Sequence, residues 1–310
     1  MVLKNSNSKK TLIVIVGPTA IGKTSLSIDV AQHFNTEILS ADSRQFYKEL
    51  KIGAAPPSLE ELNTIKHHFI GNLTLKDYYN VSIYEQEALK TLETLFNKEN
   101  IAVMVGGSGL YIDAVCSGID DLPIPEPDIR NHLKNTFDNE GIEALRFQLK
   151  HLDPDYYKNV DLANPKRLMR AIEVCLSTGH TYSSLRTKPK QKRDFNIIKI
   201  GLNRNRAELF EIINQRVNLM ITKGLIEEAK GLHPYKSLNS LNTVGYKELF
   251  DFFENKISLE LAIEKIKTNT RRFAKRQLTW FLKDKEINWL HPDDKATNIK
   301  FIEDLLSSTL

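Results

Sequence analysis

Cysteines are scarce in the sequence, and long apolar runs are missing. Only Cys116 and Cys175 are present among 310 residues, far apart and without C-x-x-C spacing. This excludes a disulfide scaffold and a cysteine zinc site, and it fits a reducing cytoplasm. The longest apolar runs, such as residues 12–16, are far shorter than the about twenty residues of a membrane-spanning helix. Because residues 1–10 are polar and lack the apolar core of a secretory signal, we expect a cytoplasmic protein without a membrane partner.

No single sign of charge dominates the chain. It has 43 Lys and Arg against 39 Asp and Glu, which gives a net charge of +4, and 41% of its residues are hydrophobic. This is the balance of a globular protein rather than of a disordered one. The basic residues nevertheless cluster in residues 186–193 and 265–285, and such clusters attract phosphate backbones. For a single lysine-rich run, a solvated surface is the alternative interpretation.

Short apolar runs rich in β-branched residues alternate with segments of helical spacing. Such runs predict buried parallel strands, which are hydrophobic throughout because helices cover both faces of the sheet. The predicted strands are residues 11–16, 36–39, 101–105 and 196–202, and a helix is predicted for residues 23–34. Three prolines in residues 123–127 predict a stiff linker, and residues 129–178 after it show only helical spacing. Residues 205–290 are also predicted to be helical, with breaks at Gly224, His233-Pro234 and Gly245.

A phosphate-loop motif lies between the first predicted strand and the first predicted helix. Residues 17–24 read G-P-T-A-I-G-K-T and match G-x-x-x-x-G-K-[ST]. Backbone N–H groups and the helix N-terminus would face an anion, Lys23 would bring a charge to its terminal phosphate, and the Thr24 hydroxyl could hold Mg²⁺. The predicted phosphate-binding residues are Gly17, Pro18, Thr19, Ala20, Ile21, Gly22, Lys23 and Thr24. A chance match is the alternative, and the lack of an acid after residues 101–105 argues against an ordinary ATPase.

These patterns together predict an α/β fold. It consists of a P-loop NTPase-like parallel sheet core, an all-helical insertion domain and a helical C-terminal region. The predicted boundaries place the first part of the core in residues 1–117, the insertion in residues 118–195, and the last strand of the core with the C-terminal helices in residues 196–310.

An acidic residue, Asp42, comes directly after the second predicted strand. Ligands of open α/β sheets bind beyond the carboxyl ends of the strands, so Asp42 is expected to face the phosphate loop. As a carboxylate it could accept a proton from an attacking amine or hydroxyl. Capping of a following helix is the equally weighted alternative for an aspartate at this position.

Seven short motifs, taken together, resemble those of one enzyme family. They are G-P-T-A-x-G-K-[ST] at residues 17–24, D-S-x-Q-x-Y-K at 42–48, V-G-G-S-G-L-Y at 105–111, N-P-K-R-L-M-R-A-I-E at 164–173, G-L-I-E-E at 224–228, V-G-Y-K-E at 244–248 and R-R-F-A-K-R-Q-L-T-W-F at 271–281. In this order they resemble the tRNA dimethylallyltransferases, also called tRNA isopentenyltransferases. The resemblance covers residues 11–290, which is nearly the whole chain.

The resemblance implies a prenyl transfer with Mg²⁺ as cofactor. The family moves a dimethylallyl group from dimethylallyl diphosphate to the N6 amine of the adenosine 3′ to the anticodon, in tRNAs that read codons beginning with U. By this resemblance the phosphate loop holds the leaving diphosphate, and Asp42 accepts the proton of the amine. Ser108 stands where the family usually has threonine, and Arg216 matches an arginine that contacts the diphosphate. A simple turn residue and a surface arginine are the respective alternatives.

The resemblance also implies residues that bind the tRNA anticodon stem-loop, whose target base must be flipped out. They are Asp42, Ser43, Arg44, Gln45 and Ser108 near the base, Lys166, Arg167, Leu168, Met169 and Arg170 in the insertion, and Arg272, Arg276 and Gln277 near the C-terminus. A solvated helix start is the alternative for the insertion residues. The aromatic residues Phe273, Trp280 and Phe281 are interpreted as core residues rather than as stacking platforms, and His67 and His68 as structural residues rather than metal ligands.

Three other functions are weighed against this one. A relative that prenylates free adenine nucleotides would need the phosphate loop and Asp42 but no anticodon grip, so the insertion and the basic C-terminal segment favour tRNA. A small-molecule kinase and a non-enzymatic RNA-binding switch are further alternatives. No segment of the sequence signals a dimer, so a monomer is expected.

Overall fold

A six-stranded parallel sheet forms the centre of the fold. The computed structural model describes residues 9–120, 122–124, 126–187 and 191–308, so Pro125 of the predicted linker and residues 188–190 of the basic run lie outside the described residues. The strands are β1 (Thr11–Val16), β2 (Ile38–Ser40), β3 (His67–His68), β4 (Ile101–Gly106), β5 (Asn196–Leu202) and β6 (Ile287–Leu290), in the order β3-β2-β4-β1-β5-β6. All five pairings are parallel, which confirms the predicted α/β core.

Two short strands at the edges of the sheet, β3 and β6, were not predicted from the sequence. β3 has only two residues, both histidines, and β6 reads I-N-W-L with a single buried position. Edge strands this short carry too little hydrophobic pattern to be recognised. The prediction that residues 196–202 form the last strand, followed by helices through residue 290, is therefore wrong at β6.

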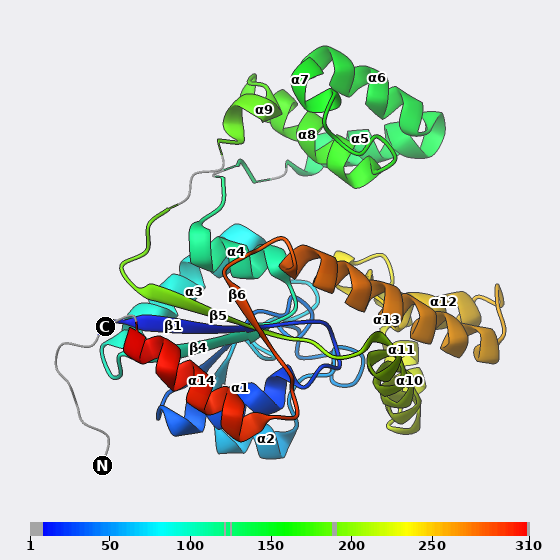
Figure 1. The fold of residues 1–310 in the computed structure, drawn as a ribbon. Helices are drawn as coiled ribbons and strands as arrows, with labels where there is room; N and C mark the ends of the chain where they lie inside the picture. The colour runs from blue at the N-terminus through cyan, green and yellow to red at the C-terminus, as the bar shows by residue number, and fades with distance from the viewer. Residues whose placement is uncertain (1–8, 121, 125, 188–190, 309–310) are drawn as a thin grey trace. The chain divides into compact units, whose positions relative to one another are not determined.

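Helices cover both faces of the sheet (Figure 1). The side chains of β1 alternate between two hydrophobic clusters, with Leu12 and Val14 on one face and Ile13 and Ile15 on the other. The first face packs against α3 (Val81–Phe96) and α4 (Gly109–Ser117). The second packs against α1 (Lys23–His33), α10 (Arg206–Thr222) and α14 (Lys295–Ser308). This two-sided burial explains why β1 reads as a continuous apolar run.

A third hydrophobic cluster joins the C-terminal helices. They are α11 (Leu225–Leu232), α12 (Tyr246–Phe253) and α13 (Leu259–Phe281), with two 3-10 turns, η1 (His233–Tyr235) and η2 (Asn239–Leu241). Gly224 and Gly245 have positive φ angles of 98° and 101° and stand directly before α11 and α12, so the predicted breaks are confirmed. A short helix, α2 (Leu59–Thr64), follows the loop after residue 51. Among the described helices, none combines the length and apolar composition needed to cross a bilayer.

Residues 117–192 form a separate helical unit, whereas the sequence placed the insertion at residues 118–195. Its helices are α5 (Pro127–Glu140), α6 (Ile142–Leu152), α7 (Pro154–Tyr157), α8 (Pro165–Thr178) and α9 (Tyr182–Leu185). The unit ends before Arg193 because that side chain bonds the carbonyls of Ala114 and Val115 and the carboxylate of Glu85 in the core.

A buried carboxylate ties α5 to α8 within this unit. Glu173, whose side chain is 1% exposed, accepts hydrogen bonds from Nε and Nη2 of Arg130 at 2.6 and 2.7 Å and from Nη1 of Arg170 at 2.7 Å. A carboxylate away from water is stable only when its oxygens are hydrogen-bonded. Arg130 therefore ties α5 to α8 through Glu173, and Arg170, on the same helix as Glu173, completes the pairing of the carboxylate.

Replacing Arg130 with alanine should destabilise the helical unit by about 2 kcal/mol, because the charged hydrogen bonds to Glu173 are lost while Arg170 still pairs it. Hydrogen exchange of the α5 and α8 amides in the full chain measures this local stability. Lys158→Ala removes an exposed pair with Asp155 from the same unit and should change it by less than about 0.5 kcal/mol. Equal protection in the two variants would contradict a structural role for the buried pair.

Candidate functional site

The phosphate loop adopts the backbone that its motif predicts. Gly22 stands directly before α1 with φ at 99°, and no side chain caps the helix, so the first N–H groups of α1 stay available to an anion. Ala20 is also left-handed, with φ at 66°. A Cβ on Gly17 would lie 2.7 Å from the carbonyl oxygen of Leu202, so only glycine lets the loop leave β1 this close to β5.

Lys23 lies under the loop, where it is half-buried. Its Nζ donates to the carbonyl oxygens of Gly17 and Pro18 at 3.0 and 2.8 Å. Burial lowers the pKa of Lys23 to about 8, an effect that the nearby Asp42 carboxylate opposes and the Arg216 guanidinium reinforces. An anion bound in the loop would restore the stability of the charged ammonium.

Arg216, on α10, faces the phosphate loop rather than open solvent. Its Nη1 lies 3.5 Å from the Thr19 hydroxyl and its Nη2 lies 3.5 Å from the carbonyl oxygen of Ala55. Burial lowers the pKa of Arg216, and Asp42 opposes the shift. Lys23, expected at the diphosphate from the phosphate-loop motif, and Arg216, expected there from the family resemblance, therefore come from α1 and α10 and lie near the same carboxylate.

Asp42 begins a turn and not a helix, which rules out the helix-capping alternative. Its Oδ1 accepts a hydrogen bond from the backbone N–H of Arg44 at 3.0 Å, and residues 43–46 form a turn. The carboxylate faces both cavities described below and interacts electrostatically with Lys23 and Arg216. One oxygen is thus fixed by the turn, and the geometry lets the other serve as a proton acceptor.

Ser108 anchors the turn of Asp42 to the end of β4. Its hydroxyl accepts a hydrogen bond from the backbone N–H of Ser43 at 3.1 Å and lies 3.3 Å from the Ser43 hydroxyl. Gly106 makes this approach possible, because a Cβ there would lie 2.3 Å from the carbonyl oxygen of Ala41. Ser108 also lines the larger cavity, so its hydroxyl both fixes the turn and reaches the site.

Gln277, expected at the tRNA, uses its amide inside the protein. It is buried on α13, where Oε1 accepts from the backbone N–H of Thr19 at 2.8 Å and Nε2 donates to the carbonyl oxygen of Gly107 at 2.9 Å. This placement fixes the phosphate loop against the end of β4. Gln45 is likewise engaged, since its Nε2 donates to the carbonyl oxygen of Ala55 at 3.0 Å.

Two neighbouring cavities meet around Asp42. The smaller, of about 340 Å³, lies over the phosphate loop, and the larger, of about 700 Å³, extends from Asp42 to α13. The residues that line both cavities are Thr19, Asp42, Ala54, Ala55, Arg216 and Gln277. The larger cavity has apolar walls from Val217, Met220 and Leu225. An anion and an apolar group joined to it can thus lie in line, with Asp42 beside their junction.

Two aromatic residues that we interpreted as core lie on the surface instead. Phe273 and Trp280 are 38% and 41% exposed and line the larger cavity, whereas Phe281 is buried as expected. The spacing of Phe273, Arg276 and Trp280 at i, i+3 and i+7 could have predicted this exposure, because it places both rings on the same face of α13 as an arginine. Arg276 lies over the Phe273 ring, 5.8 Å from its centroid, and Trp280 Nε1 donates to Asp113 at 3.1 Å.

The insertion residues expected to bind tRNA divide into exposed and buried ones. Lys166 and Arg167 are exposed in the first turn of α8. Leu168, with 0% exposure, lies in the core of the helical unit, and Met169 packs against that core. The prediction of a direct side-chain contact of Leu168 with RNA is therefore wrong, because this position of α8 faces the hydrophobic core of the helical unit. Arg170 bonds Glu173 and the Pro123 carbonyl oxygen.

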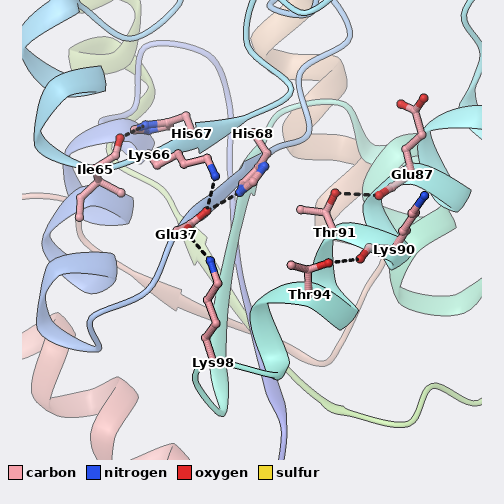
Figure 2. Close-up of polar contacts among 10 residues, drawn as sticks. All are labelled: Glu37, Ile65, Lys66, His67, His68, Glu87, Lys90, Thr91, Thr94 and Lys98. Carbon is pink, nitrogen blue, oxygen red and sulfur yellow. Dashed lines mark hydrogen bonds and ion pairs between the residues drawn. The ribbon is translucent and has the colours of Figure 1, made fainter.

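His67 and His68 form the edge strand β3, where Figure 2 shows their contacts. Nδ1 of His67 lies 2.8 Å from the carbonyl oxygen of Ile65, and Nε2 of His68 lies 2.6 Å from Glu37, which also pairs with Lys66. Within the described residues, no three His, Cys, Asp or Glu side chains gather as a metal site.

The fold and this site define a P-loop α/β protein in which the phosphate-loop cavity lies beside a larger cavity with apolar walls. Comparison with known proteins narrows the class. The family model named IPP transferase matches residues 45–284. The tRNA dimethylallyltransferase of Christiangramia forsetii is 56% identical over 288 residues, which are 93% of this chain and 95% of that protein. The chain therefore belongs to the IPP transferase family.

Solved structures agree with this assignment. The tRNA isopentenylpyrophosphate transferase of Bacillus halodurans is 32% identical, covers 97% of this chain and 98% of its own, and superposes with a TM-score of 0.72. A eukaryotic dimethylallyltransferase, described as acting on tRNA, is 26% identical, with coverage of 96% and 80% and a TM-score of 0.77. The likeness thus extends over the core and the helical unit.

The affinity for inorganic diphosphate should fall as the pH rises through about 8, because the Lys23 ammonium is charged below this pKa and neutral above it. Calorimetric titration at several pH values measures the dissociation constant. In the Lys23→Gln variant the affinity changes with pH only through the other titrating groups, including diphosphate itself. The difference between the pH profiles of the unchanged protein and this variant is therefore due to Lys23. Parallel profiles for both proteins would contradict a role of this ammonium in binding.

Proposed function

We propose that the protein transfers a dimethylallyl group from dimethylallyl diphosphate to the N6 amine of the adenosine 3′ to the anticodon in tRNAs that read codons beginning with U. Family membership supports the tRNA dimethylallyltransferase activity. The single observation that carries the chemistry is Asp42, which lies where the phosphate-loop cavity meets the apolar one. Each cavity fits one end of the reaction, the diphosphate or the adenosine.

The leaving group is stabilised by fixed positive charge. As the bond between the allylic carbon and oxygen breaks, negative charge grows on the diphosphate, and the Lys23 ammonium, the Arg216 guanidinium and the first N–H groups of α1 face it. The amine of adenosine attacks the allylic carbon from the larger cavity. Asp42 accepts the proton that the amine releases, while the Ser108 hydroxyl holds the turn and contacts the amine.

The cofactor is proposed to be Mg²⁺, held by the Thr24 hydroxyl and the oxygens of the diphosphate. Thr24 lies in the first turn of α1 and lines the smaller cavity. This donor set fits Mg²⁺, which binds substrate phosphates with few protein oxygens and keeps several waters. When bound, the metal neutralises charge on the leaving diphosphate.

The RNA is proposed to bind α13 in the core and, in the helical unit, the exposed start of α8. Arg272 and Arg276 are exposed and bring positive charge to α13, and Lys166 and Arg167 do so in the helical unit. The exposed rings of Phe273 and Trp280 give bases a surface for stacking. Since the substrate is a tRNA, we propose the cytoplasm as the place of action and retain the expectation of a monomer.

Labelled dimethylallyl diphosphate tests the function directly. The protein is incubated with it and either unmodified tRNA or AMP, and the modified nucleoside is identified by mass. Label in adenosine of tRNA and not in AMP is expected. Label in AMP alone would identify a free-nucleotide prenyltransferase, and turnover of ATP without prenyl transfer would identify a kinase.

Replacing Asp42 with asparagine should lower kcat by about 10²- to 10⁴-fold, because the amide keeps the bond to the Arg44 N–H but no longer accepts a proton. The affinity for an anticodon hairpin should stay within about twofold. Single-turnover prenylation and hairpin binding are measured side by side, with Asp304→Asn on the exposed face of α14 as control. Normal turnover with weakened hairpin binding would reverse the assignment.

Neutralising Arg272 and Arg276 to glutamine should weaken tRNA binding and reduce the slope of log affinity against log salt by up to about 1.5, because two phosphate contacts are lost. The slope is obtained from hairpin affinities over a salt series. Lys90→Gln with Lys300→Gln removes the same charge from exposed positions on α3 and α14. An identical slope in both double variants would exclude α13 from the RNA interface.

A further inference from the structure

One carboxylate holds a loop that lies along both cavities. Glu228, on α11, accepts backbone hydrogen bonds from three consecutive residues. Its Oε2 accepts from the N–H groups of Lys51 and Ile52 at 2.9 and 2.8 Å, and its Oε1 accepts from the N–H of Gly53 at 3.0 Å. Three convergent N–H groups form a binding site for an anion, and here the protein fills it with its own side chain.

A buried phenol completes this contact from a second helix. Tyr246, at the start of α12, is fully buried and donates its hydroxyl to Oε1 of Glu228 at 2.7 Å. Its ring lies directly against Gly53, where a Cβ would approach the ring and the hydroxyl within 2.5 Å. The loop therefore packs closely against α11 and α12, and at residue 53 only glycine fits.

The loop continues from this anchor into the site. Ala54 and Ala55 line both cavities, and Ala55 has a left-handed φ of 46°, which is unfavourable for a residue with a Cβ. The Ala55 carbonyl oxygen accepts from Nε2 of Gln45 at 3.0 Å and lies 3.5 Å from Nη2 of Arg216. A change at the anchor would thus reach the wall of the site and the diphosphate arginine together.

We propose that Glu228 is a positioning residue for the isoprenoid donor. It fixes residues 51–55 so that Ala54 and Ala55 close the site beside the allylic group and the Ala55 carbonyl orients Arg216 toward the diphosphate. The inference rests on the proposed function. The phosphate loop and Asp42 follow strands of the sheet, but residues 51–55 belong to no strand, so side-chain contacts from Glu228 and Gln45 hold them.

The inference assigns Glu228 to the donor rather than to the RNA. Its contacts lead to Arg216, which faces the phosphate loop, and to Ala54 and Ala55 at the junction where the allylic group would lie. The exposed residues of α13 proposed to bind RNA, including Arg272 and Trp280, have no hydrogen bond to Glu228 or to residues 51–55 in the described part of the chain. Loss of the hydrogen bonds of Glu228 should therefore weaken the affinity for the donor and leave the affinity for RNA nearly unchanged.

The test replaces Glu228 with glutamine in the full chain. The amide keeps the shape of the side chain but turns an NH₂ group toward N–H or O–H donors, so at least one anchor is broken. Donor KM should rise about tenfold, since small displacements of positioning contacts have large effects, while hairpin affinity stays within about twofold. Calorimetry with inorganic diphosphate should show the same weakening, because Arg216 is no longer oriented.

Matched variants separate positioning from general stability. Glu227→Gln changes the exposed neighbour on α11 and should behave as the original protein. Tyr246→Phe removes one of the four hydrogen bonds and should have a smaller effect than E228Q. Gly53→Ala displaces the loop without touching the carboxylate, and it should reproduce the donor defect if E228Q fails to fold.

The outcomes distinguish this inference from the proposed function. If E228Q has a lower melting temperature but unchanged donor KM and diphosphate affinity, Glu228 only supports the fold and the inference is wrong. An equal loss of donor and hairpin affinity would also overturn it. If the original protein transfers no prenyl group at all, the proposed function fails, and the diphosphate titrations still decide whether Glu228 positions the site.

Discussion

Half-buried positive charge around one carboxylate is the constraint on which the site depends. Lys23 and Arg216 come from different helices, both lose hydration, and burial lowers both pKa values. Asp42 opposes these shifts but is a single negative charge beside two cations. In the proposed reaction an incoming diphosphate would supply the missing negative charge, so binding energy would be directed to the group that must leave. A site built this way stabilises charge that grows during the reaction.

Rigid connections from several distant segments maintain this arrangement. Ser108 ties the turn of Asp42 to β4, Gln277 ties the phosphate loop to the end of the same strand, and Glu228 holds the loop that lines both cavities. Each of these residues uses its polar atoms on backbone groups. The reacting side chains can therefore keep their geometry although they lie on loops, which are otherwise the more mobile parts of a protein.

Local patterns predicted much of this molecule. The strands β1 and β5, the helix α1 and the phosphate loop follow from runs of a few residues whose structure is decided by neighbours in the chain. The edge strands β3 and β6 did not follow, because their pairing partners and not their own side chains make them strands. The exposure of Phe273 and Trp280 was predicted wrongly, because an aromatic residue gives the same sequence pattern in a core and beside a cavity.

The sequence by itself determined the chemistry available: a phosphate loop, an acid after the second strand and basic residues spaced for helix faces. Only the tertiary structure decided which polar groups face the cavities and which form hydrogen bonds inside the protein. Gln277 and Leu168 resemble binding residues in their motifs, yet one fixes the phosphate loop and the other fills a core. The physical reason is that exposure and hydrogen-bond partners arise from segments far apart in the chain, as when Glu228 meets residues 51–53.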